Sequence, residues 1–318
     1  MYHDYSMRKI IEDFKDPAPK NYILDTDAAN EVDDQFAIAY AMLAKEINLL
    51  AITAAPFVND DRAATPEEGA LRSYEEMVRV RDMVDPDGKM NIPCYHGSPS
   101  YMKEMTEPVI SEAAENIVRI VKETEGIVYI GVIGCFTNVA SALVLDPSIK
   151  DKVVVLLIGA NSFDYEGGDC NEYNLAQDRL AARVIFECGV PVVVLPAMGG
   201  TERLYTTNAE LNFYLKDQAG QIGNYLCSLF EREEGGLFNK DGSVNCKSRI
   251  IWDLGAIAVV RLGERAARLQ IVPARTIDPD GYWDMTRDLG RRMIMADDFK
   301  RWNIMPDFYT LMRSSDLK

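Results

Sequence analysis

Short runs of apolar, β-branched residues alternate with longer stretches of helical periodicity along most of the chain. The apolar runs occupy positions 22–24, 49–53, 127–133, 153–158 and 190–195. Runs of this length without alternating polar positions are typical of strands that are buried on both faces of a sheet. The clearest example is the segment VVVLLI at 153–158.

Helical patterns lie between these strands, at residues 35–44, 66–83, 108–123, 138–145 and 178–188. Thr65 precedes Pro66 and is a candidate N-cap for the second of them. Strands that alternate with helices predict an α/β fold with a mostly parallel open sheet and helices on both of its faces. This fold class places ligands at the carboxyl ends of the strands.

The second half of the chain is less regular. Residues 208–231 predict one long helix, residues 233–245 a polar glycine-rich loop, and residues 250–262 a further helix. A strand and a closing helix are expected after position 276. Because the chain has no internal repeat and no Pro/Gly/Ser-rich linker, we expect residues 1–318 to form a single domain.

Composition narrows the classes of function. The 318 residues carry a net charge of −16, which disfavours binding to nucleic acid. No apolar run reaches the length of a membrane span, and the first twenty residues lack the apolar core of a secretory signal. The six cysteines show no CxxC pair, so we expect free thiols and a cytoplasmic protein.

An unusual concentration of carboxylates follows the first predicted strand. Asp25, Asp27, Glu31, Asp33 and Asp34 fall within ten residues of one another. Carboxylates so close together repel one another unless a cation joins them, and Ca²⁺ takes oxygen ligands of this kind. A helix-capping loop is the alternative interpretation, but it accounts for only one or two of the five. The pattern does not match an EF-hand loop, which needs a central glycine.

This segment resembles the fingerprint of the inosine-uridine preferring nucleoside hydrolase family. That family has Asp-x-Asp after its first strand and Asp-Asp at the start of the next helix. Here the two pairs are Asp25 with Asp27 and Asp33 with Asp34. The spacer between the pairs, residues 28–32, is longer than in the best-known members. The resemblance implies a Rossmann-like nucleoside hydrolase fold.

Further motifs of the family follow in the expected order. Asn59, after the second predicted strand, resembles a sugar-binding asparagine. Thr137, in the segment GCFTN, resembles a threonine whose carbonyl binds calcium. Glu172 and Asn174, in the segment NEYN, are similar to residues that hold ribose hydroxyls. Asp253 resembles the late aspartate that returns to the metal. The ordered set spans about residues 21–273.

Two positions depart from the family pattern. Trp252 stands where well-studied members have a histidine beside the leaving base, so it either stacks on the base or packs in the core. The two histidines of the chain, His3 and His96, lie elsewhere in the sequence. We expect His3 to lie on the surface and His96 to be a structural residue. Asp169 stands where the family often has a sugar-binding asparagine, and we expect it to contact the substrate.

The resemblance implies a catalytic centre for cleaving an N-glycosidic bond. Asp27 is the expected general base, and Asp25 and Asp33 are expected to orient the metal ligands. The implied Ca²⁺ ligands are Asp27, Asp34, the Thr137 carbonyl and Asp253. The expected substrate is a small-molecule nucleoside, and the family pattern also implies a homo-oligomer, either a dimer or a tetramer.

Two other functions are compatible with parts of the sequence. A magnesium-dependent phosphohydrolase of the haloacid dehalogenase type also carries Asp-x-Asp after its first strand, but it leaves the pair Asp33 and Asp34 unexplained. A ribose- or nucleoside-binding protein without catalytic activity would explain Trp252 in place of the family histidine.

Overall fold

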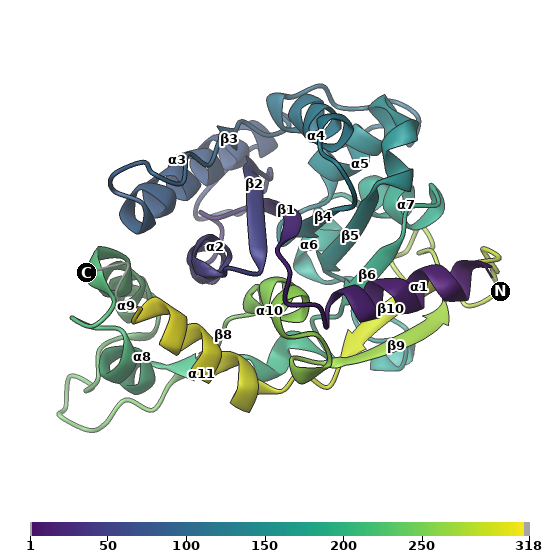
Figure 1. The fold of residues 1–318 in the computed structure, drawn as a ribbon. Helices are drawn as coiled ribbons and strands as arrows, with labels where there is room; N and C mark the ends of the chain where they lie inside the picture. The colour runs from purple at the N-terminus through teal and green to yellow at the C-terminus, as the bar shows by residue number, and fades with distance from the viewer. Residues whose placement is uncertain (1, 315–318) are drawn as a thin grey trace.

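A mostly parallel sheet of eight strands forms the centre of the computed structural model, which describes residues 2–314, with side chains from residue 6 onward. The strand order is β3-β2-β1-β4-β5-β6-β10-β9, and the helices surround the sheet (Figure 1). Only the last pair, β10 and β9, is antiparallel. The predicted fold class is therefore confirmed. The strands are β1 (Lys20–Thr26), β2 (Ile47–Ala54), β3 (Cys94–Tyr95), β4 (Val128–Val132), β5 (Val153–Ile158), β6 (Val192–Leu195), β9 (Arg268–Pro273) and β10 (Arg292–Asp297).

Helices cover both faces of this sheet, as the alternation of patterns predicts. One hydrophobic cluster joins the sheet to α1 (Tyr2–Asp13), α2 (Asp34–Leu43), α10 (Leu254–Leu262) and α11 (Arg301–Met312). A second cluster joins the opposite face to α4 (Glu112–Glu123), α5 (Thr137–Leu145) and α7 (Arg179–Glu187). Every side chain of β4 and β5 is buried, which explains why these strands are apolar throughout.

Helix boundaries follow local capping chemistry. Helix α3 spans Pro66–Val84, and the Thr65 hydroxyl accepts a hydrogen bond from the Glu68 amide, as expected for an N-cap. Helix α4 begins at Glu112, later than predicted, because Ser111 caps it. Gly189, with a φ of 99°, follows the end of α7.

The prediction of one long helix over residues 208–231 is wrong. Two helices occupy this region, α8 (Asn208–Tyr214) and α9 (Gly220–Glu234). Asp217 (φ 58°) and Gly220 (φ 62°) adopt left-handed backbone conformations between them, and these conformations are incompatible with a continuous helix. The predicted helix over residues 250–262 is also shorter, because β8 (Ser248–Ile250) pairs with β7 (Tyr205–Thr207) in a separate two-stranded sheet.

The remaining elements are short. They are α6 (Tyr173–Gln177) and four 3₁₀ turns, η1 (Pro147–Asp151), η2 (Tyr165–Gly167), η3 (Thr201–Arg203) and η4 (Gly263–Arg265). The closing strand and helix expected after position 276 are β10 and α11. All six cysteines are free, as predicted. Among residues 2–314, no helix combines the length and the apolar character that crossing a bilayer requires.

Candidate active site

The acidic segment begins at the carboxyl end of β1, in the middle of the sheet. Asp25 is completely buried, and its Oδ1 accepts hydrogen bonds from the Thr53 hydroxyl (2.6 Å) and the Asn138 amide (2.8 Å). The Thr26 hydroxyl donates to Asp34 at 2.5 Å. Side chains from three neighbouring segments therefore fix the start of the acidic segment. Asp25 does not line the cavity described below, and its contacts suit the orienting role expected from the sequence.

Three buried carboxylates converge beside this segment. Asp33 and Asp34 lie at the start of α2, and Asp253 lies directly before α10, which packs against α2. One carboxylate oxygen from each of these residues lies within 4.8 Å of the other two. Burial raises the pKa of Asp34 to about 7. Burial and repulsion by neighbouring carboxylates raise the pKa values of Asp33 and Asp253 well above the ordinary range.

Asp27 faces the same space from the loop after β1. Its side chain is almost fully buried, and its Oδ2 accepts a hydrogen bond of 3.1 Å from the Asn30 amide. Burial raises its pKa well above the usual value, and the charges of Asp34 and Asp33 raise it further. Buried carboxylates this close together could hold a cation, which would remove their mutual repulsion.

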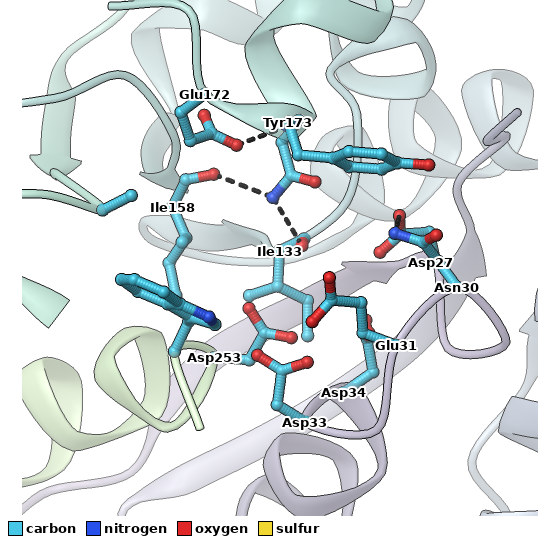
Figure 2. A pocket seen from close by; sticks show the side chains of 13 residues that line it. Asp27, Asn30, Glu31, Asp33, Asp34, Ile133, Ile158, Glu172, Tyr173 and Asp253 are labelled. Carbon is cyan, nitrogen blue, oxygen red and sulfur yellow. Dashed lines mark hydrogen bonds between the residues drawn. The ribbon is translucent and has the colours of Figure 1, made fainter. Parts of the chain in front are cut away.

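These carboxylates line a cavity of about 210 Å³ at the carboxyl ends of the strands (Figure 2). Its walls combine an acidic side with a polar and aromatic side. The lining residues are Asp27, Asn30, Glu31, Asp33, Asp34, Ile133, Ile158, Glu172, Tyr173, Asn174, Ala197, Trp252 and Asp253. Seven of the predicted site residues are therefore neighbours in space although they come from distant parts of the sequence. They are Asp27, Asp33, Asp34, Glu172, Asn174, Trp252 and Asp253.

Glu172 lies opposite the acidic group (Figure 2). Asn174, two positions further along at the start of α6, also lines the cavity. Glu172 caps this helix, and its carboxylate accepts hydrogen bonds from the backbone amides of Ala160 (2.7 Å), Leu175 (3.3 Å) and Asn174. Burial raises the Glu172 pKa to about 7. The Asn174 amide donates to the carbonyls of Ile133 (2.9 Å) and Ile158 (3.2 Å). Its carboxamide oxygen accepts no hydrogen bond from the described residues, so it is available to a hydroxyl donor.

Two aromatic side chains complete the walls. Trp252 is half-buried and packs against the edge of the first hydrophobic cluster while it lines the cavity. It therefore packs against the core and also forms part of the cavity wall, and its stacking on a base stays a prediction. Tyr173 donates its hydroxyl to the Val58 carbonyl at 2.8 Å, and this bond holds the ring at the cavity.

Thr137 is not among the residues that line the cavity, and its carbonyl as a metal ligand stays a prediction. Thr137 is the first residue of α5, where a carbonyl normally accepts the amide one turn further along the helix. Its hydroxyl donates to Asp178 at 2.7 Å. Ile133, directly after β4, lines the cavity in its place. Gly134 allows this close approach, because a Cβ atom there would lie 2.9 Å from the Asp27 amide nitrogen.

Two further predicted contacts also lie outside the cavity lining. Asn59 donates to the Asn30 side chain at 3.0 Å and lies beside the Tyr173 hydroxyl, so it contacts two residues that line the cavity. The Asp169 carboxylate accepts a hydrogen bond of 2.8 Å from the backbone amide of Asn171, and Asp169 forms a β-bridge with Tyr282. A direct contact of either residue with a ligand in the cavity remains a prediction.

Histidine is absent from the cavity among the described residues. His96 is exposed and stacks on Tyr74, with ring centroids 3.6 Å apart. The side chain of His3 lies outside the described side chains. An imidazole from the described part of the chain therefore does not reach a ligand in this cavity.

Sequence reasoning assigned no role to several lining residues. Asn30 and Glu31 lie in the long spacer, and their positions between the two Asp pairs were the available signal. Tyr173 lies between Glu172 and Asn174, where the start of a helix presents it to the same side. Ile158 and Ala197 carry no polar side chain, so only the tertiary structure identifies them.

Known proteins share both the sequence pattern and the fold. Residues 22–267 match the family described as inosine-uridine preferring nucleoside hydrolase. The chain is 26% identical over 233 residues to a protein named probable uridine nucleosidase 2 from Arabidopsis thaliana. The aligned region covers 67% of this chain and 69% of that protein.

Solved structures support the same fold. A plant nucleoside hydrolase superposes with a TM-score of 0.68 at 19% identity, over 94% of this chain and 99% of that one. A purine-preferring ribonucleoside hydrolase from Gardnerella vaginalis gives a TM-score of 0.68 at 21% identity, over 92% and 98% of the two chains. At these identities the superpositions establish the fold alone.

Proposed function

Because the chain belongs to the inosine-uridine preferring nucleoside hydrolase family, we propose that its acidic cavity is the active site of a calcium-dependent nucleoside N-ribohydrolase. Family membership and the nucleosidase relatives make the protein an enzyme that hydrolyses the N-glycosidic bond of a ribonucleoside. They also decide against a haloacid dehalogenase-type phosphohydrolase and a binding protein without activity. The convergence of Asp33, Asp34 and Asp253 in the cavity carries the assignment of the site.

A divalent cation fits the donor set of this cavity. Three buried carboxylates with oxygens within 4.8 Å of one another repel one another strongly when all are ionised. A hard cation with carboxylate ligands removes that repulsion, and Ca²⁺ accommodates several such ligands. We assign Asp27, Asp34 and Asp253 as ligands, with Asp33 beside them. We propose the Ile133 carbonyl as the main-chain ligand in preference to that of Thr137, because Ile133 lines the cavity.

Asp27 is the proposed general base. A bound cation would orient a water molecule and lower its pKa. The Asp27 carboxylate accepts the proton of the attacking water. The side-chain amide of Asn30 donates to Oδ2 of this carboxylate at 3.1 Å and so fixes its orientation. Its burial supports this role, because a desolvated carboxylate has a greater affinity for a proton.

Glu172 and Asn174 are the proposed ribose-binding residues. Both amide hydrogens of Asn174 are committed to backbone carbonyls, which fixes its oxygen toward the cavity. A carboxylate and a carboxamide oxygen accept hydrogen bonds from hydroxyl groups, so this wall suits a ribose. Holding the sugar rigidly favours the oxocarbenium-like transition state, in which hydrogen bonds to the hydroxyls strengthen.

Trp252 is the proposed contact of the leaving base. Its indole ring lines the cavity beside Asp253, so a planar base bound above the ribose can pack against it. An aromatic wall stabilises the base by burial and stacking rather than by transferring a proton. This assignment agrees with the absence of histidine from the cavity among the described residues.

We also propose that residues 1–318 form one domain that self-associates. The terminal helix α11 packs on α2, and β10 joins the main sheet, so the last elements are part of the same core. Phe213 of α8 and Trp302 of α11 are 73% and 68% exposed. Contact with a second copy would bury such aromatic side chains. Light scattering coupled to size-exclusion chromatography measures the oligomer, and a monomer at all concentrations would contradict this proposal.

A reducing-sugar assay tests the proposed function directly. Purified protein, stripped with EDTA, is supplied with inosine, uridine, guanosine, adenosine or cytidine and with Ca²⁺, Mg²⁺ or no added metal. We expect release of ribose from at least one nucleoside, with the highest rate in Ca²⁺. Metal analysis of the untreated protein should find one divalent ion per chain. Full activity after complete metal removal would contradict the calcium dependence.

A further inference from the structure

The long spacer between the two Asp pairs is held along its length. Ala28 is completely buried, and its carbonyl accepts a hydrogen bond of 2.5 Å from the Gln35 amide. The same amide contacts the Glu31 carbonyl at 3.4 Å. Val32 is also completely buried. The spacer is therefore a packed segment whose shape is determined by its neighbours, and its two ends carry the carboxylates that face the cavity.

One arginine holds the main chain in the middle of this spacer. The guanidinium of Arg62 donates to the Ala29 carbonyl at 3.1 Å and to the Glu233 carboxylate at 3.0 Å. Glu233 lies in the last turn of α9. Because both partners are on different segments, Arg62 connects the spacer to the end of that helix.

A second arginine holds the spacer through a side chain. The guanidinium of Arg249 lies 2.9 Å from the Glu31 carboxylate and 3.1 Å from that of Glu234, the residue after Glu233. Arg249 belongs to β8, four positions before Asp253. It therefore links the segment that carries Asp33 and Asp34 to the segment that carries Asp253.

We propose that Arg62 and Arg249 are positioning residues that clamp the spacer onto the end of α9 and so hold the cavity carboxylates together for the cation. The proposal rests on the calcium site proposed above. It adds two residues that do not line the cavity, and it explains why two consecutive glutamates end α9. Neither arginine touches the reacting groups, so both act through the spacer.

The direction in which cation affinity changes on removal of Arg249 distinguishes a positioning role from a purely electrostatic one. Arg249 carries a positive charge near an acidic site, because it pairs with Glu31, which lines the cavity. Removing that charge should by itself strengthen cation binding, because like charges repel. Loss of positioning should instead weaken binding, since residues that orient metal ligands commonly contribute about 10–100-fold to affinity. Weaker binding in a variant that lacks Arg249 therefore identifies positioning.

Calcium titration of the EDTA-stripped protein by isothermal calorimetry provides the test. We expect Arg249→Met to raise the Kd for Ca²⁺ by about tenfold or more, and Arg62→Met to raise it by a smaller factor. Arg249→Lys keeps the charge but loses the forked contact to two carboxylates, so its Kd should be intermediate. Circular dichroism establishes that each variant is folded, and Arg249→Lys and Arg62→Met carry the test if Arg249→Met does not fold.

Arg232→Met is the matched control. Arg232 contacts the same Glu233 carboxylate at 3.1 Å but makes no hydrogen bond or ion pair with the spacer among the described residues. Its Kd should stay within about twofold of the parent value, because exposed ion pairs contribute little. Unchanged or tighter Ca²⁺ binding by Arg249→Met would overturn the clamp. Failure of the parent protein to bind any divalent ion would instead overturn the calcium site itself.

Discussion

A carboxylate oxygen of Asp33 lies within 4.8 Å of one from Asp253, although the two residues are far apart in the sequence. The contact forms because α2 and α10 pack side by side on the same face of the sheet, and each aspartate stands at the beginning of its helix. The amino ends of helices favour negative charge, which partly offsets the repulsion between the carboxylates. This relationship gives the cavity its acidic wall.

Replacing the proposed base should abolish most turnover without unfolding the protein. Asp27→Asn keeps the size of the side chain but cannot accept the proton of the attacking water. General-base catalysis contributes about 10²–10⁴-fold, so we expect kcat to fall by a factor in this range. The reducing-sugar assay measures kcat, and Asp60→Asn, at an exposed position in a nearby loop, is the control. Near-normal turnover by Asp27→Asn would show that another group takes the proton.

Stability without calcium should depend on pH in a defined direction. Asp34 has a pKa of about 7 in the folded protein, compared with 3.8 ordinarily. Between these values the folded state binds more protons than the unfolded state, so its stability should fall as the pH rises from about 4 to about 7. Asp25 and Glu172, whose pKa values burial also raises to about 7, contribute with the same sign.

Calcium should compensate for this loss because it takes the place of the protons on its ligands. The difference in Tm between Ca²⁺ and EDTA should therefore grow from about pH 5 to about pH 8. Differential scanning fluorimetry across this range measures it. A difference that is constant or that shrinks with rising pH would be inconsistent with cation binding to these carboxylates.

Loss of Asn174 should weaken substrate binding. Asn174→Ala removes the proposed acceptor for a ribose hydroxyl and leaves the carbonyls of Ile133 and Ile158 without their donor. A buried substrate hydroxyl without its acceptor costs about 1–3 kcal/mol, so kcat/KM should fall by about 5–150-fold. Asn171→Ala is the control, because the side-chain amide of Asn171 donates to the Asp280 carbonyl at 3.1 Å and Asn171 does not line the cavity. Equal losses in the two variants would argue against a specific ribose contact.

Trp252 should report binding through its fluorescence. We expect a non-hydrolysed nucleoside analogue to quench the tryptophan emission of the protein, and Trp252→Phe to remove that response. Aromatic pairs contribute about 0.5–1.5 kcal/mol beyond burial, so Trp252→Ala should raise KM by about three- to tenfold, with Trp252→Phe closer to the parent. Trp302→Phe, on the exposed face of α11, should retain the quenching. Quenching that persists in Trp252→Phe would place the base elsewhere.

The strands and most helices follow from the sequence because their physical causes are local. Segment 153–158 is apolar at every position, and this alone predicts a strand buried on both faces, as β5 is. Thr65 and Pro66 predict the start of α3 because capping depends on adjacent residues. The break between α8 and α9 was missed, since a left-handed conformation at Asp217 has no strong signal in sequence periodicity.

The sequence by itself determined the fold class, the order of the motifs and the place of the acidic segment at the end of β1, because parallel strands bring their carboxyl ends to one edge. Only the tertiary structure placed Ile133 in the cavity and Thr137 outside it. Only the tertiary structure joined Arg249 to Glu31, which are 218 positions apart. Contacts of this kind depend on how helices and loops from distant segments pack together, and that packing leaves no local pattern in the chain.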